Sequence, residues 1–257
     1  MAPAVLFRDA VSLAGRFPLL SGLSLEVAEG EVVHLRGPNG AGKSSFLRCC
    51  AGLAALSGGE AWVLGHDLRA DRQSLRREVG LLGHASFLYQ ELSVEENLRF
   101  AVRAARSPLA GIEPALSRLG LEGRLRRSAV GRLSAGQRRR VSIAVLLARS
   151  PRLWLLDEPH AGLDADAREL LDVLVDEARQ RGATVVLASH ELDRAGELAD
   201  RVVELAGGRA LGEPAGSAEV PPAGAGLAVP AGRSPGPAVT LPPAGPAGEE
   251  EVGCDVA

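Results

Sequence analysis

The chain is almost without lysine: Lys43 is the only one, and the other basic residues among its 29 Lys+Arg are arginines. Aromatic residues are also scarce, at 3%, whereas hydrophobic residues reach 46%, which predicts a globular protein with a mainly aliphatic core. The formal net charge of −3 lacks the basic excess of nucleic-acid-binding domains, so we expect no nucleic-acid partner. The arginine clusters at 124–127 and 138–140 are expected to form solvated helix faces and salt bridges.

Long apolar runs, a basic leader and paired cysteines are missing as well. No uninterrupted apolar run approaches the roughly 18 residues that a membrane-spanning helix requires. The segment 1–7 lacks the basic and apolar regions of a secretory signal, so we expect a cytoplasmic protein. Cys49, Cys50 and Cys254 form neither a C-x-x-C metal pair nor an even disulfide framework, which predicts reduced thiols.

Strand and helix patterns alternate along most of the chain and predict an α/β fold. Strands are expected near 4–7, 23–27, 31–35, 153–156 and 184–188. From about 85 to 132 the pattern becomes helical, with a capping box formed by Ser93 and Glu96. Further helices are predicted over 134–149 and 166–180.

The composition changes after about residue 212. Nine of the chain's 16 prolines lie beyond that point, among alanines and glycines and without periodicity. Such a segment buries too little apolar surface to offset the entropy lost on ordering, so 213–257 is predicted to be a disordered tail.

The single lysine lies in a segment that fits the phosphate-loop pattern G-x-x-x-x-G-K-[ST] at every fixed position. Its residues are Gly37, Pro38, Asn39, Gly40, Ala41, Gly42, Lys43 and Ser44. A strand precedes the segment and a helix follows it, so the backbone N–H groups of 39–43 are expected to cradle triphosphate oxygens. Lys43 would neutralise the β- and γ-phosphate oxygens, Ser44 would bind Mg²⁺, and Ser45 would contact the α-phosphate. A compact ammonium suits this loop, whereas the planar fork of arginine would crowd it.

Two adjacent carboxylates end the apolar strand at 153–156. Because a buried strand delivers its last residues to one edge of the sheet, Asp157 is predicted to reach the Mg²⁺ shell. Glu158 is predicted to orient the attacking water or accept its proton.

A third segment, Leu133-Ser134-Ala135-Gly136-Gln137, resembles the L-S-G-G-Q signature of ABC-type ATPases, with Ala135 in place of the first glycine. Further landmarks of that family lie in the same order along the chain. These are His84 at the Q-loop position, Asp164 in the D-loop and His190 as the switch histidine.

The resemblance covers about residues 4–210. It implies a P-loop NTPase (ABC ATPase) core with an N-terminal antiparallel β subdomain and an inserted α-helical subdomain at about 85–150. The nucleotide-binding domain would span 1–212 and the tail 213–257.

The resemblance also implies a machine of two chains. ABC ATPases bind two ATP molecules between two nucleotide-binding domains arranged head to tail, so the signature residues Ser134, Gly136 and Gln137 would contact ATP held by a second copy. Glu158 would be the general base, His190 would contact the γ-phosphate, and Asp164 would link the two sites. An integral membrane permease would hold the dimer at the cytoplasmic face of the membrane.

One position departs from the family pattern, and one further residue is a candidate for contact with the base. The Q-loop residue is usually a glutamine, and His84 is a poorer Mg²⁺ ligand than an oxygen donor, although it can donate to water or phosphate. Phe17 is the nearest candidate for the aromatic residue that stacks on adenine.

Within the family, several segments resemble the ATP-binding subunit of the haem exporter of cytochrome c maturation. They are 37–45, 82–84, 96–100 and 133–137. The distinguishing features are His84 and Ala135, and a body ending near residue 212 agrees with that compact subgroup. ATPases of drug, antibiotic or polysaccharide exporters share most of these segments and remain an alternative.

Proteins of other classes fit less well. Soluble ABC ATPases carry two cassettes in one chain or a long coiled coil, whereas this chain has one cassette and no sustained heptads. A GTPase would need an N-K-x-D motif, and the only lysine is already in the phosphate loop.

Overall fold

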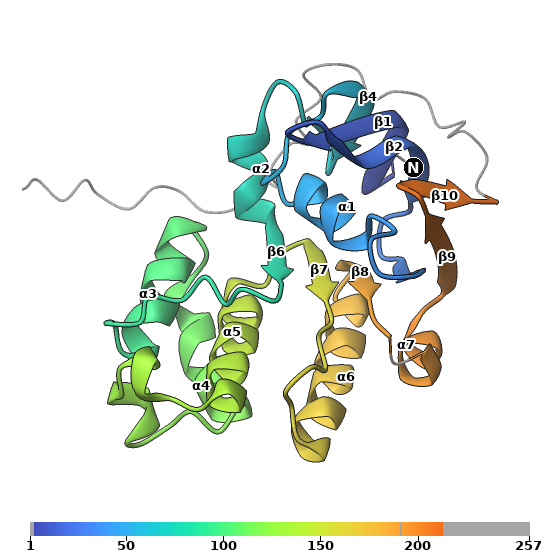
Figure 1. The fold of residues 1–257 in the computed structure, drawn as a ribbon. Helices are drawn as coiled ribbons and strands as arrows, with labels where there is room; N and C mark the ends of the chain where they lie inside the picture. Colours follow the sequence, from blue (N-terminus) through green and yellow to red (C-terminus); the bar gives the residue numbers. More distant parts are fainter. Residues whose placement is uncertain (1–2, 191, 213–257) are drawn as a thin grey trace, which may run out of the picture. The chain divides into compact units, whose positions relative to one another are not determined.

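Two β-sheets organise the residues that the computed structural model describes, 3–190 and 192–212 (Figure 1). One sheet has four strands in the order β2-β1-β4-β5, and the other has six in the order β10-β9-β3-β8-β7-β6. All described residues belong to the first of two units, Met1–Ala225. The second unit, Gly226–Ala257, and the predicted tail at 213–257 lie outside the described residues.

The four-stranded sheet is antiparallel and comes from the first part of the chain. Its strands are β1 (Val5–Ala14), β2 (Phe17–Val27), β4 (Gly58–Val63) and β5 (His66–Asp67). The larger sheet is parallel except for its last strand, β10, which pairs antiparallel with β9. Its strands are β3 (Val32–Arg36), β6 (Val79–Leu82), β7 (Leu153–Asp157), β8 (Thr184–Ala188), β9 (Arg201–Ala206) and β10 (Arg209–Leu211).

Seven α-helices accompany the sheets in the described part of the chain. They are α1 (Lys43–Cys50), α2 (Arg72–Glu78), α3 (Val94–Ala104), α4 (Ile112–Arg118), α5 (Ala135–Arg149), α6 (Ala165–Gln180) and α7 (Leu192–Leu198). Short 3-10 turns occupy Leu109–Gly111, Leu125–Arg127 and Val130–Arg132. None of the helices at 3–190 and 192–212 is both long and apolar enough to cross a bilayer.

The central parallel strands are buried on both faces, and their side chains alternate between two hydrophobic cores. In β7, Leu153 and Leu155 pack into the core shared with β1, β2 and α1, whereas Trp154 and Leu156 pack into the core shared with α3 to α6. Figure 1 shows α1 beside the four-stranded sheet and α3, α4 and α5 gathered on the other side of the parallel strands. Full burial of one such side chain stabilises the fold by about 2 kcal/mol. Because these strands supply side chains to both cores, they stabilise both sides of the sheet.

This architecture confirms the predicted fold class, an α/β core with an antiparallel β subdomain and a group of added helices. The expected strand near 4–7 is only the start of β1, and that near 23–27 is the end of β2. The capping box at the start of α3 is confirmed, with the N–H of Glu96 donating to the Ser93 hydroxyl and the Glu96 carboxylate accepting from the N–H of Ser93. Cys49 and Cys50 are buried free thiols on α1, as expected.

Three neighbouring strands bring the sequence motifs to one edge of the larger sheet. β3 leads into the glycine loop, β8 into Ser189 and His190, and β7 into Asp157 and Glu158. Since β3 pairs with β8 and β8 with β7, all in parallel, the carboxyl ends of these strands lie side by side. Segments separated by more than a hundred residues therefore meet at this edge.

Candidate functional site

A cavity of about 260 Å³ lies at the carboxyl ends of β3, β7 and β8. Most residues predicted to contact phosphate or metal line it together. They are Asn39, Gly40, Ala41, Gly42, Lys43, Ser44, Ser45, Asp157, Glu158 and His190, joined by Pro18 and Leu19 of β2. Pro18 and Leu19 are additions from the structure, and they follow the candidate Phe17, whose side chain is 77% exposed.

The glycines of the loop are required by its backbone. Gly37 and Gly42 have φ angles of 144° and 105°, in the region that favours glycine. A Cβ atom on Gly37 would lie 2.1 Å from the carbonyl oxygen of Leu205, and one on Gly42 would lie 2.9 Å from that of Leu19. The loop is therefore pressed against β9 on one side and β2 on the other, and it has no room for side chains at these positions.

The buried Lys43 holds the loop closed on itself. Its Nζ atom donates hydrogen bonds to the carbonyl oxygens of Gly37 at 2.6 Å and Pro38 at 3.1 Å. Both carbonyls belong to the residues that begin the predicted phosphate loop. Its burial and its two short contacts with the loop support the expectation that a compact cation is needed here.

The N-terminus of α1 completes an anion-binding surface. Its N-cap is Gly42, which has no side chain to accept from the amides of the first turn. Those amides belong to Lys43, Ser44 and Ser45, all of which line the cavity. Free first-turn N–H groups, a positive helix end and a lysine fit the phosphates of a nucleotide.

The same cavity fits a magnesium ion. Ser44 offers a hydroxyl oxygen from α1, and Asp157 offers a carboxylate from the end of β7. Mg²⁺ binds through one or two protein oxygens and completes its shell with water and substrate phosphate.

Glu158 is held in an unusual backbone conformation. Its φ is 47°, which side-chain-bearing residues seldom adopt, and its N–H donates to the carbonyl of Ala188 at 2.8 Å. This turn directs the carboxylate toward His190, whose N–H lies 3.3 Å from Oε2 and whose Nε2 lies 3.5 Å from Oε1 of Glu158. A carboxylate and an imidazole thus lie close together in the wall of the cavity.

His34 supports the segment next to His190. It is buried in β3, and its Nε2 lies 3.2 Å from the carbonyl oxygen of Ser189. Burial lowers the pKa of His34, so a neutral ring is favoured there. His34 therefore has a structural role beside the site.

His84 lies in a second cavity, of about 440 Å³, which shares Asp157 and Glu158 with the first. The exposed His84 follows the end of β6, the strand next to β7. It therefore lies on the other side of the two carboxylates from the phosphate loop.

The signature residues form the start of α5. The N–H of Gln137 donates to the hydroxyl of Ser134 at 3.2 Å, and the N–H of Ser134 donates to Oε1 of Gln137 at 2.9 Å. A Cβ on Gly136 would lie 3.3 Å from the carbonyl oxygen of Gly162, so the signature lies against the D-loop. Ser134, Gly136 and Gln137 are absent from the lining of the phosphate cavity within the described part of the chain.

Asp164 begins the next long helix. It is the N-cap of α6, where Oδ1 accepts from the N–H of Ala167 at 2.9 Å, and Oδ2 lies 2.6 Å from a guanidinium nitrogen of Arg140. The Ala167 N–H, with a smaller contribution from Arg140, lowers the pKa of Asp164. The D-loop carboxylate is thereby tied to the signature helix.

The prediction that residues 138–140 form a solvated face is wrong for Arg139. This side chain is half-buried and donates to the carbonyl oxygens of Gly83 at 2.6 Å, Glu158 at 2.7 Å and Pro159 at 3.3 Å. The prediction is correct for the other cluster, because Arg126 forms ion pairs with Glu95 and Glu113. The sequence contains no signal that separates the two cases, since both clusters are runs of arginine on predicted helices.

The chain is similar to known proteins over most of its length, not only at these motifs. Residues 20–161 match the family model described as ABC transporter. The chain is 38% identical to "Cytochrome c biogenesis ATP-binding export protein CcmA 2" of Cupriavidus metallidurans, over 74% of this chain and 92% of that protein. It is 35% identical to "Nod factor export ATP-binding protein I" of Rhizobium etli, over 82% of this chain and 67% of that protein.

A solved structure of another protein has a similar fold. A dimeric ATP-binding cassette described in a post-hydrolysis state, bound to ADP and Pi, matches with a TM-score of 0.73 and 26% identity. The match covers 80% of this chain and 96% of that one.

Proposed function

We propose a specific task for this chain, which belongs to the ABC transporter family and is an ATP-binding and ATP-hydrolysing subunit. The task is to power an export step of cytochrome c biogenesis, with haem as the cargo. One observation supports the proposed roles in catalysis. Lys43, Glu158 and His190 line one cavity at the carboxyl ends of three parallel strands. These groups supply a cation for phosphate, a base for water and a polar contact for the γ-phosphate.

The phosphate loop holds the substrate. The loop amides of 39–43 and the first turn of α1 bind the phosphate oxygens of ATP, while Lys43 exchanges its loop carbonyl contacts for the β- and γ-phosphates. Ser45 contacts the α-phosphate. Pro18 and Leu19 border the cavity from β2, next to the exposed ring of Phe17, on which adenine would stack.

Hydrolysis depends on the carboxyl ends of β7 and β8. Glu158 accepts a proton from the attacking water, and His190 holds the γ-phosphate side of the cavity. Ser44 and Asp157 would hold Mg²⁺, which when bound neutralises charge on the phosphate oxygens. His84, which borders Asp157 and Glu158 from the other cavity, contacts water rather than metal.

A second copy of the chain completes the site. Ser134 is exposed, and because its oxygen uses one lone pair to accept from the N–H of Gln137, its O–H group can still donate to a phosphate. With Gly136 and Gln137 it would close over the ATP of the partner in a head-to-tail dimer, and Asp164 would link the two sites. The dimeric cassette bound to ADP and Pi supports this arrangement by analogy.

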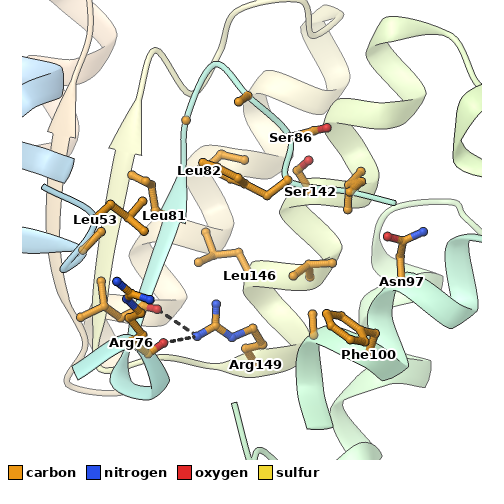
Figure 2. A pocket seen from close by; sticks show the side chains of 18 of the residues that line it. Leu53, Arg76, Leu81, Leu82, Ser86, Asn97, Phe100, Ser142, Leu146 and Arg149 are labelled. Atoms are coloured by element: carbon orange, nitrogen blue, oxygen red, sulfur yellow. Dashed lines mark hydrogen bonds between the residues drawn. The ribbon is translucent and has the colours of Figure 1, made fainter. Parts of the chain in front are cut away.

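An apolar groove is the proposed contact with the membrane permease. It has a volume of about 260 Å³ and lies between β6, the residues that follow α1, and the inserted helices. Figure 2 shows Leu53 and Leu81 on one side of it and Phe100 on the other, with Leu146 between them. The rings of Tyr89 and Phe100 pack edge to face, 4.9 Å apart, and are 49% and 51% exposed.

The position of the groove supports this assignment. Its wall includes Gly83 and 85–89, so the segment that carries His84 borders both the groove and the cavity of Asp157 and Glu158. An apolar helix of the permease seated there would press on the same segment that faces the catalytic carboxylates. The chain would in this way be held at the cytoplasmic face of the membrane.

The catalytic proposal is tested with Glu158→Gln. The variant should bind ATP, accumulate as a dimer and lose turnover by about 10³-fold, since general base catalysis contributes between about 10² and 10⁴. Dimer formation is measured by light scattering with ATP, and turnover by phosphate release. A Glu158→Gln protein that hydrolyses ATP at the normal rate contradicts the role of Glu158.

The permease contact is tested by co-expression with a candidate membrane subunit chosen from the genes next to this one. Phe100→Asp should reduce recovery of the complex, whereas Leu109→Asp, which charges an apolar side chain that is 46% exposed and outside the groove, should not. Equal recovery of both complexes contradicts the groove assignment. A neighbouring six-helix membrane subunit with cytochrome-assembly genes supports haem as cargo, whereas a drug or polysaccharide permease supports the alternative.

A further inference from the structure

Arg139 joins three segments that the proposed reaction brings together. The residue lies on α5, five positions after Ser134, and its guanidinium is half-buried. One nitrogen donates to the carbonyl oxygen of Gly83, next to His84, at 2.6 Å. The other nitrogens donate to the carbonyl oxygens of Asp157 at 3.4 Å, Glu158 at 2.7 Å and Pro159 at 3.3 Å.

Of the two contacts that Arg139 makes with residues after β7, the shorter is to the carbonyl oxygen of Glu158, the proposed general base. The backbone of Glu158 has a φ of 47°, which is unfavourable for a residue with a side chain and must be held by its surroundings. Its N–H donates to Ala188 at 2.8 Å, and its carbonyl oxygen accepts from Arg139 and, at 3.2 Å, from the N–H of Ala161. Of the two groups that donate to this carbonyl oxygen, the guanidinium of Arg139 is a side chain, and it comes from α5.

Charge and shape both favour arginine in this place. The guanidinium presents five N–H donors in a plane, which allows one side chain to reach several carbonyls at once. Its positive charge also faces the negative charges of Asp157 and Glu158. A lysine would reach fewer of these carbonyls, and a neutral side chain would leave both carboxylates without this cation.

We propose that Arg139 is a positioning residue that clamps the backbone of Glu158 in its catalytic conformation and ties it to the His84 segment and the signature helix. The inference rests on the proposed role of Glu158 as general base. Arg139 itself touches backbone carbonyls, and its effect on catalysis passes through the direction of the Glu158 carboxylate.

The test compares Arg139→Gln and Arg139→Lys in the full chain. Arg139→Gln should lower kcat for ATP by about 10²-fold, the loss expected from a displacement of about 1 Å at a reacting group, while KM changes less than about threefold. Arg139→Lys should recover part of kcat, because it restores the charge and one or two of the hydrogen bonds. Unchanged kcat in Arg139→Gln overturns the proposal.

Arg126→Gln is the matched control for stability. Arg126 also binds several partners through its guanidinium, but these partners are Glu95 and Glu113 within the helical region. It should lower the midpoint of thermal unfolding without lowering kcat. If Arg126→Gln lowers kcat as much as Arg139→Gln, then loss of stability explains both, and the proposal is wrong.

A double variant separates this inference from the proposed function. When Glu158→Gln already prevents proton transfer, adding Arg139→Gln should change the residual rate less than about twofold, because both act on one step. A further loss of about 10²-fold shows that Arg139 acts elsewhere and overturns the inference. Normal turnover in Glu158→Gln alone would instead overturn the role of Glu158, so the two failures are distinct.

Discussion

The Nε2 atom of His190 lies 3.0 Å from Oδ1 of Asn39, which joins the segment after β8 to the phosphate loop before α1. The contact fixes the imidazole in the wall of the cavity, where the carboxylate of Glu158 also lies 3.5 Å from Nε2. Under the proposed function, a side chain at this junction would contact the γ-phosphate and contribute little to binding of the rest of the nucleotide.

His190→Ala should therefore reduce turnover more than binding. We expect kcat to fall by about 10²-fold, the loss typical of one oriented polar group in an active site, while the Kd for ATP changes less than about threefold. Asn39→Ala should reduce kcat less, because it removes only the group that orients the imidazole. The measurements are phosphate release and nucleotide titration. A loss of ATP binding in His190→Ala that equals its loss of turnover contradicts this role.

Lys43→Arg tests whether charge alone is enough in the phosphate loop. Lys43 is 7% exposed, and its ammonium already lies within 2.6 Å and 3.1 Å of two loop carbonyls, so the larger guanidinium has no space without opening the loop. ATP binding should weaken at least about tenfold, close to the effect of Lys43→Met, as judged by nucleotide titration. An arginine variant with normal affinity and turnover contradicts the steric explanation.

Alanine substitutions at Gly37 and Gly40 distinguish a glycine that is in close contact with its neighbours from one that has free space around it. At Gly37 a Cβ would lie 2.1 Å from a backbone oxygen of β9, whereas at Gly40 it would meet nothing within 4 Å, although φ is 79°. We expect Gly40→Ala to cost about 1 kcal/mol of unfolding free energy, the penalty of a left-handed backbone. Gly37→Ala should cost about 3 kcal/mol or more, because the loop must move away from β9. Urea unfolding measures both free energies. Equal losses of unfolding free energy would contradict the prediction, because they would show that β9 moves aside at little cost.

The sequence predicted the parts of the site that depend on local pattern. Strand, glycine loop and helix around Lys43, and the apolar strand before Asp157, could be recognised because each motif lies beside the element that positions it. The meeting of these motifs follows from parallel pairing of β3, β8 and β7, which any α/β arrangement of this kind produces.

Other features depend on contacts that no local pattern contains. β6 has four residues, Val79–Leu82, and is stabilised by pairing with β7. The sequence predicts Arg139 to be one of three exposed arginines, and only the packing of α5 near the ends of β6 and β7 makes it a donor to the carbonyl oxygens of Gly83 and Glu158. The hydrogen bond between His190 and Asn39 likewise joins residues 151 positions apart.

Glu95 provides a pH-dependent contribution to stability in the helical region. Hydrogen bonds from Arg126, and then from Arg99, lower the pKa of Glu95 from 4.5 to about 2. A carboxyl whose pKa is lower in the folded state stabilises that state above the unfolded pKa, and this contribution disappears as the pH falls from about 4.5 toward 2.

Glu95→Gln should lower the free energy of unfolding by about 1 kcal/mol at pH 7, the upper end for pairs that solvent partly screens. The difference from the parent protein should persist at pH 5 and shrink at pH 3, where the Glu95 carboxyl is protonated in the unfolded chain while it remains largely ionised in the folded one. Glu113→Gln serves as the control, since this carboxylate is 63% exposed and shares only Arg126. It should cost less at every pH. Urea unfolding at the three pH values measures both variants, and a Glu95→Gln difference that stays constant down to pH 3 would contradict the linkage between Arg126 and Glu95.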